Sequence, residues 1–299
     1  MTRITSTTSN RRMLNDLATA QRSLLRAQGR LSSGKELERA SDGPARALAA
    51  LDHRAMLRRS EQFQRNASDA RGWLVAADTA LTSGVQEMTR ARTLVIGANS
   101  GGSDPNARKA IADELRNLRE GMVQLGNSKY MDRPIFSGNA RVTEAFDSTG
   151  AYLGDGGAVQ RPIAEAVTIQ VNRSGTEVFG VSNPGDPMNG NVFEVLDQVI
   201  AAVESGDPGA MATGLARLDA MTDQMEAAQV ELGARARQVE DVMARNEVID
   251  LDRRQALSEV EDVDVAQALI DVRAREFTYQ AALSSAATVM QVSLLDFLR

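Results

Sequence analysis

The segment Gly29-Arg-Leu-Ser-Ser-Gly34-Lys35 has the spacing of a phosphate-binding loop, in which a glycine-rich turn and a lysine hold a nucleotide. Two features argue against that function. Glu36 stands where a Ser or Thr would ligate Mg²⁺, and the residues before Gly34 follow the pattern of an amphipathic helix rather than a buried strand. We therefore interpret Gly34 as a helix C-cap and keep a nucleotide-binding coiled-coil regulator as an alternative hypothesis.

Other residue types that support catalysis or metal binding are scarce. The 299-residue chain has no cysteine and a single histidine, His53, which excludes thiolate sites and any scheme with two imidazoles. Carboxylates gather at 36–38 and 259–264, but they stand at charged helix junctions without the sequence pattern of a pocket. We expect no enzyme activity, no catalytic or metal-ligating residue and no cofactor.

Composition favours long helices over a large globular core. Apolar residues make up 42% of the chain and charged residues 25%, whereas aromatic residues make up only 4%. The net charge of −6 argues against nucleic acid as a partner. Residues 1–8 lack the apolar stretch of a cleaved signal peptide, and the uncharged run 277–295 is too polar for a membrane span. We expect neither nucleic acid nor membrane as a partner.

Apolar residues recur every three or four positions in the stretches that lack proline. Proline is absent from 1–43, 45–104 and 209–299, so long helices can form there. The recurring series are typical of coiled-coil-like seams. They are Leu14, Leu17, Leu24 and Leu31; the uncharged series from Phe63 to Val95; Leu218, Met225, Leu232 and Val239; and the series from Val265 through Leu269, Tyr279, Leu283 and Met290 to Phe297.

The middle of the chain has a different period. Nine of the 23 glycines fall between Gly138 and Gly190, and residues 166–172 and 176–181 alternate between apolar and polar side chains. We predict two strands there, within a small β insert at 139–185 whose contacts are mainly internal. In the flanking helical regions, Asp104-Pro105 and Asp207-Pro208 each predict a helix start with an acidic N-cap before a proline.

The predicted fold is mainly α: a long antiparallel helical rod with coiled-coil-like packing, paired N- and C-terminal helices, and a small inserted β domain. Charge favours the pairing of the two ends. Residues 1–35 carry seven basic side chains against one acid, whereas residues 240–276 carry eleven acids against five arginines. The expected domains are 1–43 with 260–299 (the assembly domain), 44–138 with 186–259 (the helical rod) and 139–185 (the β insert).

The last helix is apolar on several faces. After Glu276 the only charges are Asp296 and Arg299. One N-terminal helix can cover a single side, so we expect neighbouring subunits to bury the others. The expected assembly and partner-interface residues are Leu14, Leu17, Leu24, Leu31, Tyr279, Leu283, Met290, Leu294, Leu295, Phe297 and Leu298.

Segments near both ends of the chain carry a family pattern. Leu31–Lys35 is followed by Arg39–Ala45, and Tyr279–Leu283 is followed by Ser293–Leu298. These segments resemble the terminal signatures shared by flagellins and the flagellar hook–filament junction proteins. The resemblance covers nearly the whole chain.

Central residues resemble the junction proteins more than the flagellins. They are Ile135–Gly138 with Phe146 downstream, and Tyr152–Asp155 followed by the segment that ends at Gly175–Phe179. The departure from the family pattern is Gly43, where a second Asp is usual before the proline.

The resemblance implies a structural protein that is secreted, uncleaved, by the flagellar type III export route to the extracellular bacterial flagellum. The implied role is an adaptor between the preceding hook-associated protein and the flagellin filament. The implied partners are identical subunits in a ring, flagellin, that hook-associated protein and a cytosolic export chaperone. A flagellin filament subunit is the alternative.

Overall fold

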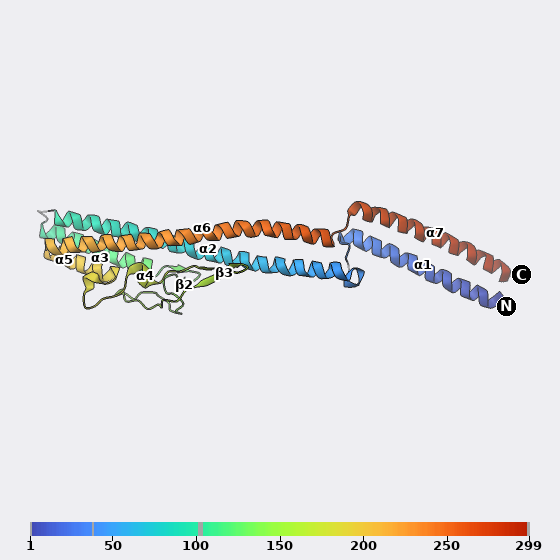
Figure 1. The fold of residues 1–299 in the computed structure, drawn as a ribbon, viewed down its shortest axis with the longest axis horizontal. Helices are drawn as coiled ribbons and strands as arrows, with labels where there is room; N and C mark the ends of the chain where they lie inside the picture. Colours follow the sequence, from blue (N-terminus) through green and yellow to red (C-terminus); the bar gives the residue numbers. More distant parts are fainter. Residues whose placement is uncertain (1, 38, 101–103, 298–299) are drawn as a thin grey trace. The chain divides into compact units, whose positions relative to one another are not determined.

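The computed structural model describes residues 2–37, 39–100 and 104–297, and the chain is mainly helical, as the sequence predicted (Figure 1). The α-helices are α1 (Thr2–Ser33), α2 (Pro44–Asn99), α3 (Pro105–Gly126), α4 (Gly175–Phe179), α5 (Val192–Ser205), α6 (Pro208–Glu261) and α7 (Val265–Phe297). The short elements are the 3-10 helices η1 (Ala40–Asp42) and η2 (Pro187–Asn189) and the strands β1 (Lys129–Tyr130), β2 (Arg133–Pro134), β3 (Gln160–Ala164) and β4 (Val167–Gln170).

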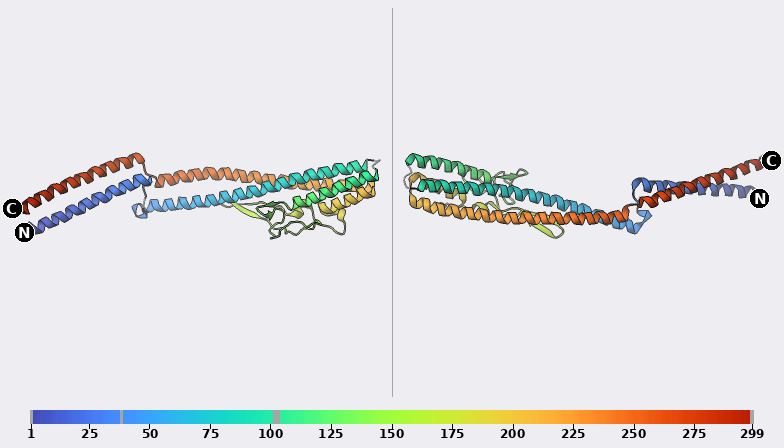
Figure 2. Two further views of the ribbon diagram at one scale, coloured as in Figure 1. Left: turned by 180° about the vertical axis from the view of Figure 1, so that it is seen from behind. Right: turned by 90° about the horizontal axis from the view of Figure 1, so that it is seen from above.

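The chain divides into two compact units. The first contains the described residues of 1–59 and 249–299, and the second contains 60–248. In the first unit α1 and α7 run antiparallel and side by side, with the two chain termini at the same end (Figures 1 and 2). The predicted pairing of the terminal helices is confirmed.

Local sequence signals explain where the helices begin and end. Gly34 has φ +69°, a conformation that glycine adopts at low cost, and it follows the last residue of α1. Gly29 lies inside α1, so the segment is not a strand-to-helix phosphate loop. Asp207 caps α6, because its Oδ1 accepts hydrogen bonds from the amides of Gly209 (2.8 Å) and Ala210 (3.2 Å).

The core of the second unit follows the predicted seams. In this unit α2 and α6 lie side by side, and α3 packs against α5 (Figure 2). Every member of the uncharged α2 series from Ala67 to Val95 is buried, as are all four residues of the α6 series. Many of these residues are alanines, and small side chains allow the helix backbones to approach closely.

The predicted β insert contains one hairpin and a short helix. β3 and β4 pair antiparallel, with Arg161 opposite Ile169, which confirms a strand within 166–172. The predicted strand at 176–181 is wrong, because residues 175–179 form α4. A capping box starts that helix: Glu177 N donates to Ser174 Oγ (3.3 Å), and Ser174 N donates to Glu177 Oε2 (3.0 Å).

The insert also packs on the helices rather than mainly on itself, contrary to the expectation from its glycine-rich sequence. Phe136, Phe146 and Phe179 form one aromatic cluster with Phe193 of α5, with ring centroids 5.0–5.9 Å apart. The side-chain amide of Asn246 on α6 donates to the carbonyl of Ile163 (2.9 Å). The insert is therefore an integral part of the second unit.

Candidate assembly surface

The residues predicted to pair the terminal helices are only partly covered. Leu14 and Leu283 expose 54% and 41% of their surface, whereas small residues such as Ala27 and Ala286 are fully buried between the helices. Two helices can cover only a narrow stripe of each other, so larger side chains at its edges stay open. The predicted residues that are half-buried are Leu17, Leu24, Leu31 and Tyr279.

Five predicted interface residues have side chains that lie outside the described residues. Their participation in an interface stays a prediction. They are Met290, Leu294, Leu295, Phe297 and Leu298.

Helix α7 exposes large apolar side chains that the sequence analysis did not assign to the surface. Phe277 is 74% exposed, and Ile270 is 61% exposed. Val265 and Leu269 belong to the seam that was expected to pack, yet they are 63% and 50% exposed. Helix α1 covers only one stripe of α7 and leaves these two seam positions open in the single chain. Exposed apolar side chains of this size and number are typical of an interaction surface.

The two terminal helices also leave a hollow between them. It has a volume of about 390 Å³ and is lined by Arg12, Met13, Asp16 and Leu17 of α1 and by Ala282 and Ser285 of α7. The lining is half polar, so the hollow has the character of an open groove rather than of an apolar cavity. It adds to the surface that the helix pair presents.

The segment that connects α1 to α2 and the segment that connects α6 to α7 meet at a buried carboxylate. The side chain of Glu261 is 4% exposed; its Oε2 accepts from Lys35 Nζ (2.6 Å), and its Oε1 lies 2.6 Å from Arg54 Nη2. Backbone hydrogen bonds join the same segments, from Glu36 N to Glu261 O (2.8 Å) and from Val263 N to Gly34 O (3.0 Å). We call this arrangement the Glu261 joint.

Electrostatics at the joint favours the charged carboxylate. Burial alone would raise the pKa of Glu261, but hydrogen bonds from Lys35 and Arg54, together with their positive charges, lower it overall. Sequence reasoning placed Glu261 among the carboxylates of a charged helix junction. No sequence signal separates it from its neighbours, because its burial depends on contacts with residues far away in the sequence.

The expected charge pairing between the two ends of the chain is mostly not formed within the described residues. Among the basic side chains of residues 8–35, only Lys35 forms an ion pair with an acid of 240–276. Close ion pairs between the basic and acidic segments therefore contribute little to the pairing of the two ends.

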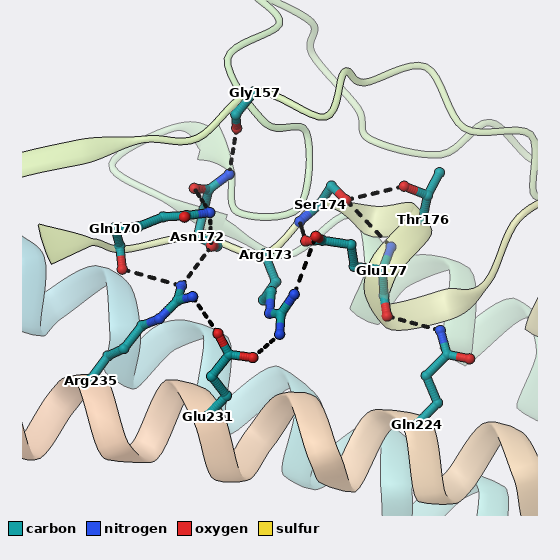
Figure 3. Close-up of polar contacts among 10 residues, drawn as sticks. All are labelled: Gly157, Gln170, Asn172, Arg173, Ser174, Thr176, Glu177, Gln224, Glu231 and Arg235. Atoms are coloured by element: carbon teal, nitrogen blue, oxygen red, sulfur yellow. Dashed lines mark hydrogen bonds and ion pairs between the residues drawn. The ribbon is translucent and has the colours of Figure 1, made fainter.

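A pair of arginines holds the insert on α6 (Figure 3). Arg235 Nη1 donates to the carbonyls of Gln170 (3.3 Å) and Asn172 (3.1 Å). Both Arg235 and Arg173 form ion pairs with Glu231. Burial, and then the charge of Arg173, lower the pKa of Arg235, although an arginine stays protonated at any physiological pH.

The central residues that carry the family resemblance meet in space. Tyr152 Oη donates to the carbonyls of Phe136 (2.9 Å) and Asp155 (2.7 Å). Asp155 Oδ1 accepts from the amides of Asn139 (2.6 Å) and Gly157 (2.9 Å), and these bonds lower the pKa of Asp155. At Gly138, with φ +69°, an added Cβ would lie 2.2 Å from the Asp155 carbonyl oxygen. These residues fix the fold of the insert.

The part of the chain that the structure describes contains no group of three or more His, Asp or Glu side chains placed to hold a metal ion. Among the described helices, none is both long and apolar enough to cross a membrane.

Comparison with known families identifies the N-terminal part of the chain. Residues 4–140 match the model of the bacterial flagellin N-terminal helical region. This segment includes α1, α2 and α3 and extends to the start of the insert.

Three curated relatives extend the comparison along the chain. Flagellar hook-associated protein 3 of Salmonella typhimurium is 23% identical over 64% of this chain, and the match spans 63% of that protein. Hook-associated protein 3 of Escherichia coli is 21% identical over 89% of this chain and 90% of its own length. Bacillus subtilis flagellin is 23% identical over 93% of this chain and 91% of its own length.

A solved structure shares the fold. The flagellar hook-associated protein 3 of Legionella pneumophila superposes with a TM-score of 0.60 at 17% identity, over 70% of this chain and 98% of that chain. Residues 4–140 thus match the flagellin N-terminal helical region, and the chain as a whole is similar to flagellar hook-associated protein 3 and to flagellin and shares the fold of a solved hook-associated protein.

Proposed function

We propose that this protein is a structural adaptor of the bacterial flagellum, at the junction between the hook-associated proteins and the flagellin filament. The observation that carries the proposal is the terminal helix pair, which leaves large apolar side chains such as Phe277 and Ile270 open to solvent. A subunit that works only inside a polymer has a reason to keep such a surface. The names of two relatives, which are hook-associated proteins, support a position next to the hook.

The proposed partners follow from that position. Identical subunits form a ring, flagellin lies on one side, and the preceding hook-associated protein lies on the other. The subunit reaches the extracellular flagellum by the flagellar type III export route, and a cytosolic chaperone covers the apolar α7 before export. The role is structural and involves no catalysis, metal or cofactor.

A flagellin filament subunit is the second candidate. The match to Bacillus subtilis flagellin over most of the chain favours it. The residues of the insert that resemble the junction proteins, including Tyr152 and Asp155, favour the adaptor.

Deletion of the gene distinguishes the two candidates. For an adaptor, electron microscopy shows hooks without filaments while flagellin accumulates in the medium. For a flagellin, the deletion removes the filament protein itself, so no filament protein encoded by another gene accumulates in the medium. Filaments of normal number and length on the deletion strain would contradict both candidates.

A further inference from the structure

Helix α1 presents a row of arginines that lack acidic partners within the described residues. Arg11, Arg12, Arg22 and Arg26 are all exposed. The guanidinium of Arg22 donates only to its own helix, to Ala18 O (3.2 Å) and Thr19 Oγ1 (3.2 Å). None of these four side chains forms an ion pair with a described acid. We call these four residues the arginine row.

The last turns of α6 present exposed acids on one face. Asp252 and Glu259 are seven residues apart, which places them two turns apart on the same side of the helix. Glu259 Oε1 accepts a hydrogen bond from Gln255 Nε2 (3.3 Å), which lies between them on that face. Neither acid forms an ion pair with a described basic residue. We call Asp252 and Glu259 the acidic stripe.

Each charged surface has an exposed leucine beside it. Leu25 lies between Arg22 and Arg26 in sequence and is 58% exposed, and Leu251 precedes Asp252 and is 60% exposed. Apolar side chains beside opposite charges on the two partners are typical of a specific protein interface, where charge complementarity sets register and selects the partner.

We infer that the arginine row of one subunit contacts the acidic stripe of a neighbouring copy of this chain. The inference rests on the proposed function, because it requires the chain to be a subunit of an assembly. A second copy explains both surfaces at once, whereas an unrelated acidic partner would leave the acidic stripe unused. Because the two surfaces are different, the contact can repeat from one copy to the next, and a repeating contact closes into a ring or continues as a helix.

Charge reversal tests the contact in cells that express only the variant gene. Arg22→Glu with Arg26→Glu is expected to reduce filaments per cell by at least about tenfold, because like charges would then face each other. Asp252→Arg with Glu259→Arg is expected to have the same effect. Combining all four substitutions in one chain is expected to restore filaments to within about twofold of wild type.

The matched control is Arg71→Glu, which reverses an exposed arginine that is paired with Glu240 on α6 of the same chain (3.1 Å). This variant is expected to keep filament numbers. The variant with all four substitutions could stay defective although it is exported and melts like wild type. In that case α1 contacts a different partner and the inference is wrong. Normal filaments on either double variant would also overturn it.

A cross-linking experiment gives an answer that does not depend on filament counts. The chain has no native cysteine, so Leu25→Cys with Leu251→Cys introduces the only thiols. Oxidation of flagella that carry this variant is expected to link copies into dimers and larger species, and each single-cysteine variant should give at most dimers. Only monomer from the double variant would contradict the contact. Filaments on the deletion strain would instead contradict the proposed function itself.

Discussion

At the scale of single residues, buried ions hold the connections between helices. Glu261 forms ion pairs with Lys35, which follows α1, and with Arg54 of α2. Backbone hydrogen bonds donated by Glu36 and Val263 lie on either side of it. Removal of a buried charge leaves its partners without compensation, which costs more than an exposed ion pair contributes. The joint therefore depends on one carboxylate.

Glu261→Gln tests this dependence. The variant keeps the side-chain shape but loses the charge that binds Lys35 and Arg54. Hydrogen exchange at the amides of Glu36 and Val263 is expected to accelerate about tenfold or more, equivalent to about 1.4 kcal/mol. Glu36→Gln, which removes an exposed pair with Arg46, is the matched control and should leave the Val263 amide protected.

The joint should also weaken in acid. Because its pKa is lowered in the folded chain, the Glu261 carboxylate stabilises the joint above the usual glutamate pKa of about 4.3, and this stabilisation is lost as pH falls through the lower folded value. Protection of the Val263 amide should fall across that range. The Glu261→Gln variant, which lacks this carboxylate, is the reference. An equal acid response in both proteins would contradict the assignment.

Glu231 has the corresponding role under the insert (Figure 3). Glu231→Gln removes the charge shared by Arg173 and Arg235, which are only partly exposed. We expect unfolding free energy to fall by about 1–3 kcal/mol, because the negative charge is lost and one of the two acceptor oxygens becomes an NH2 group that faces a cation. Urea unfolding followed by the fluorescence of Trp73, the single tryptophan and 2% exposed, measures this loss. Glu240→Gln, in an exposed pair, should change it by less than about 0.5 kcal/mol.

At the scale of elements, close packing of α2 against β1 depends on a glycine. An added Cβ at Gly72 would lie 2.2 Å from Tyr130 Oη, and the Tyr130 ring packs edge-on against Trp73 with centroids 6.0 Å apart. Gly72→Ala must displace that tyrosine, so we expect a loss of about 1–3 kcal/mol. Urea unfolding followed by far-ultraviolet circular dichroism avoids any local effect on Trp73.

At Gly97, in the same helix, we expect an alanine substitution to raise stability rather than lower it. No atom lies within 4 Å of an added Cβ there. Gly97→Ala should therefore stabilise the protein by about 0.5–1 kcal/mol, since alanine loses less backbone entropy than glycine in a helix. Equal effects of the two alanine substitutions would show that Tyr130 does not pack as the structure describes.

Periodicity predicted the helices and their core. The regular spacing of a seam such as Leu218–Val239 places its residues on one face of a helix, and that face is buried. Periodicity did not say which seam positions of α7 lie against α1, and Val265 and Leu269 are exposed in the single chain. The alternation of apolar and polar side chains wrongly predicted a strand where α4 forms, although Ser174 and Glu177 have the spacing of a capping box. The Glu261 joint needed tertiary contacts between residues more than 200 positions apart.

At the scale of the whole molecule, assembly and folding should depend on different surfaces. Phe277 is 74% exposed, so Phe277→Asp should leave the melting temperature of the purified chain within about 1–2 °C of wild type, since surface changes rarely exceed about 0.5 kcal/mol. The same change places a charge where the proposed polymer excludes water, so cells that export the variant should lose filaments.

Val230→Asp is the matched control for Phe277→Asp. Val230 lies on α6 in the second unit and is 69% exposed. Its substitution should leave both melting and filament number unchanged. Loss of filaments from both variants would mean that assembly is not specific to the terminal helix pair. A melting temperature several degrees lower for Phe277→Asp would mean that α7 stabilises the single chain.

The most direct test of the junction assignment is immunogold electron microscopy of whole flagella with antibodies against residues 139–185. An adaptor should be labelled at one position, where the hook meets the filament, and the label should vanish in the deletion strain together with the filament. Gold along the whole filament would identify a flagellin instead and would contradict the adaptor role.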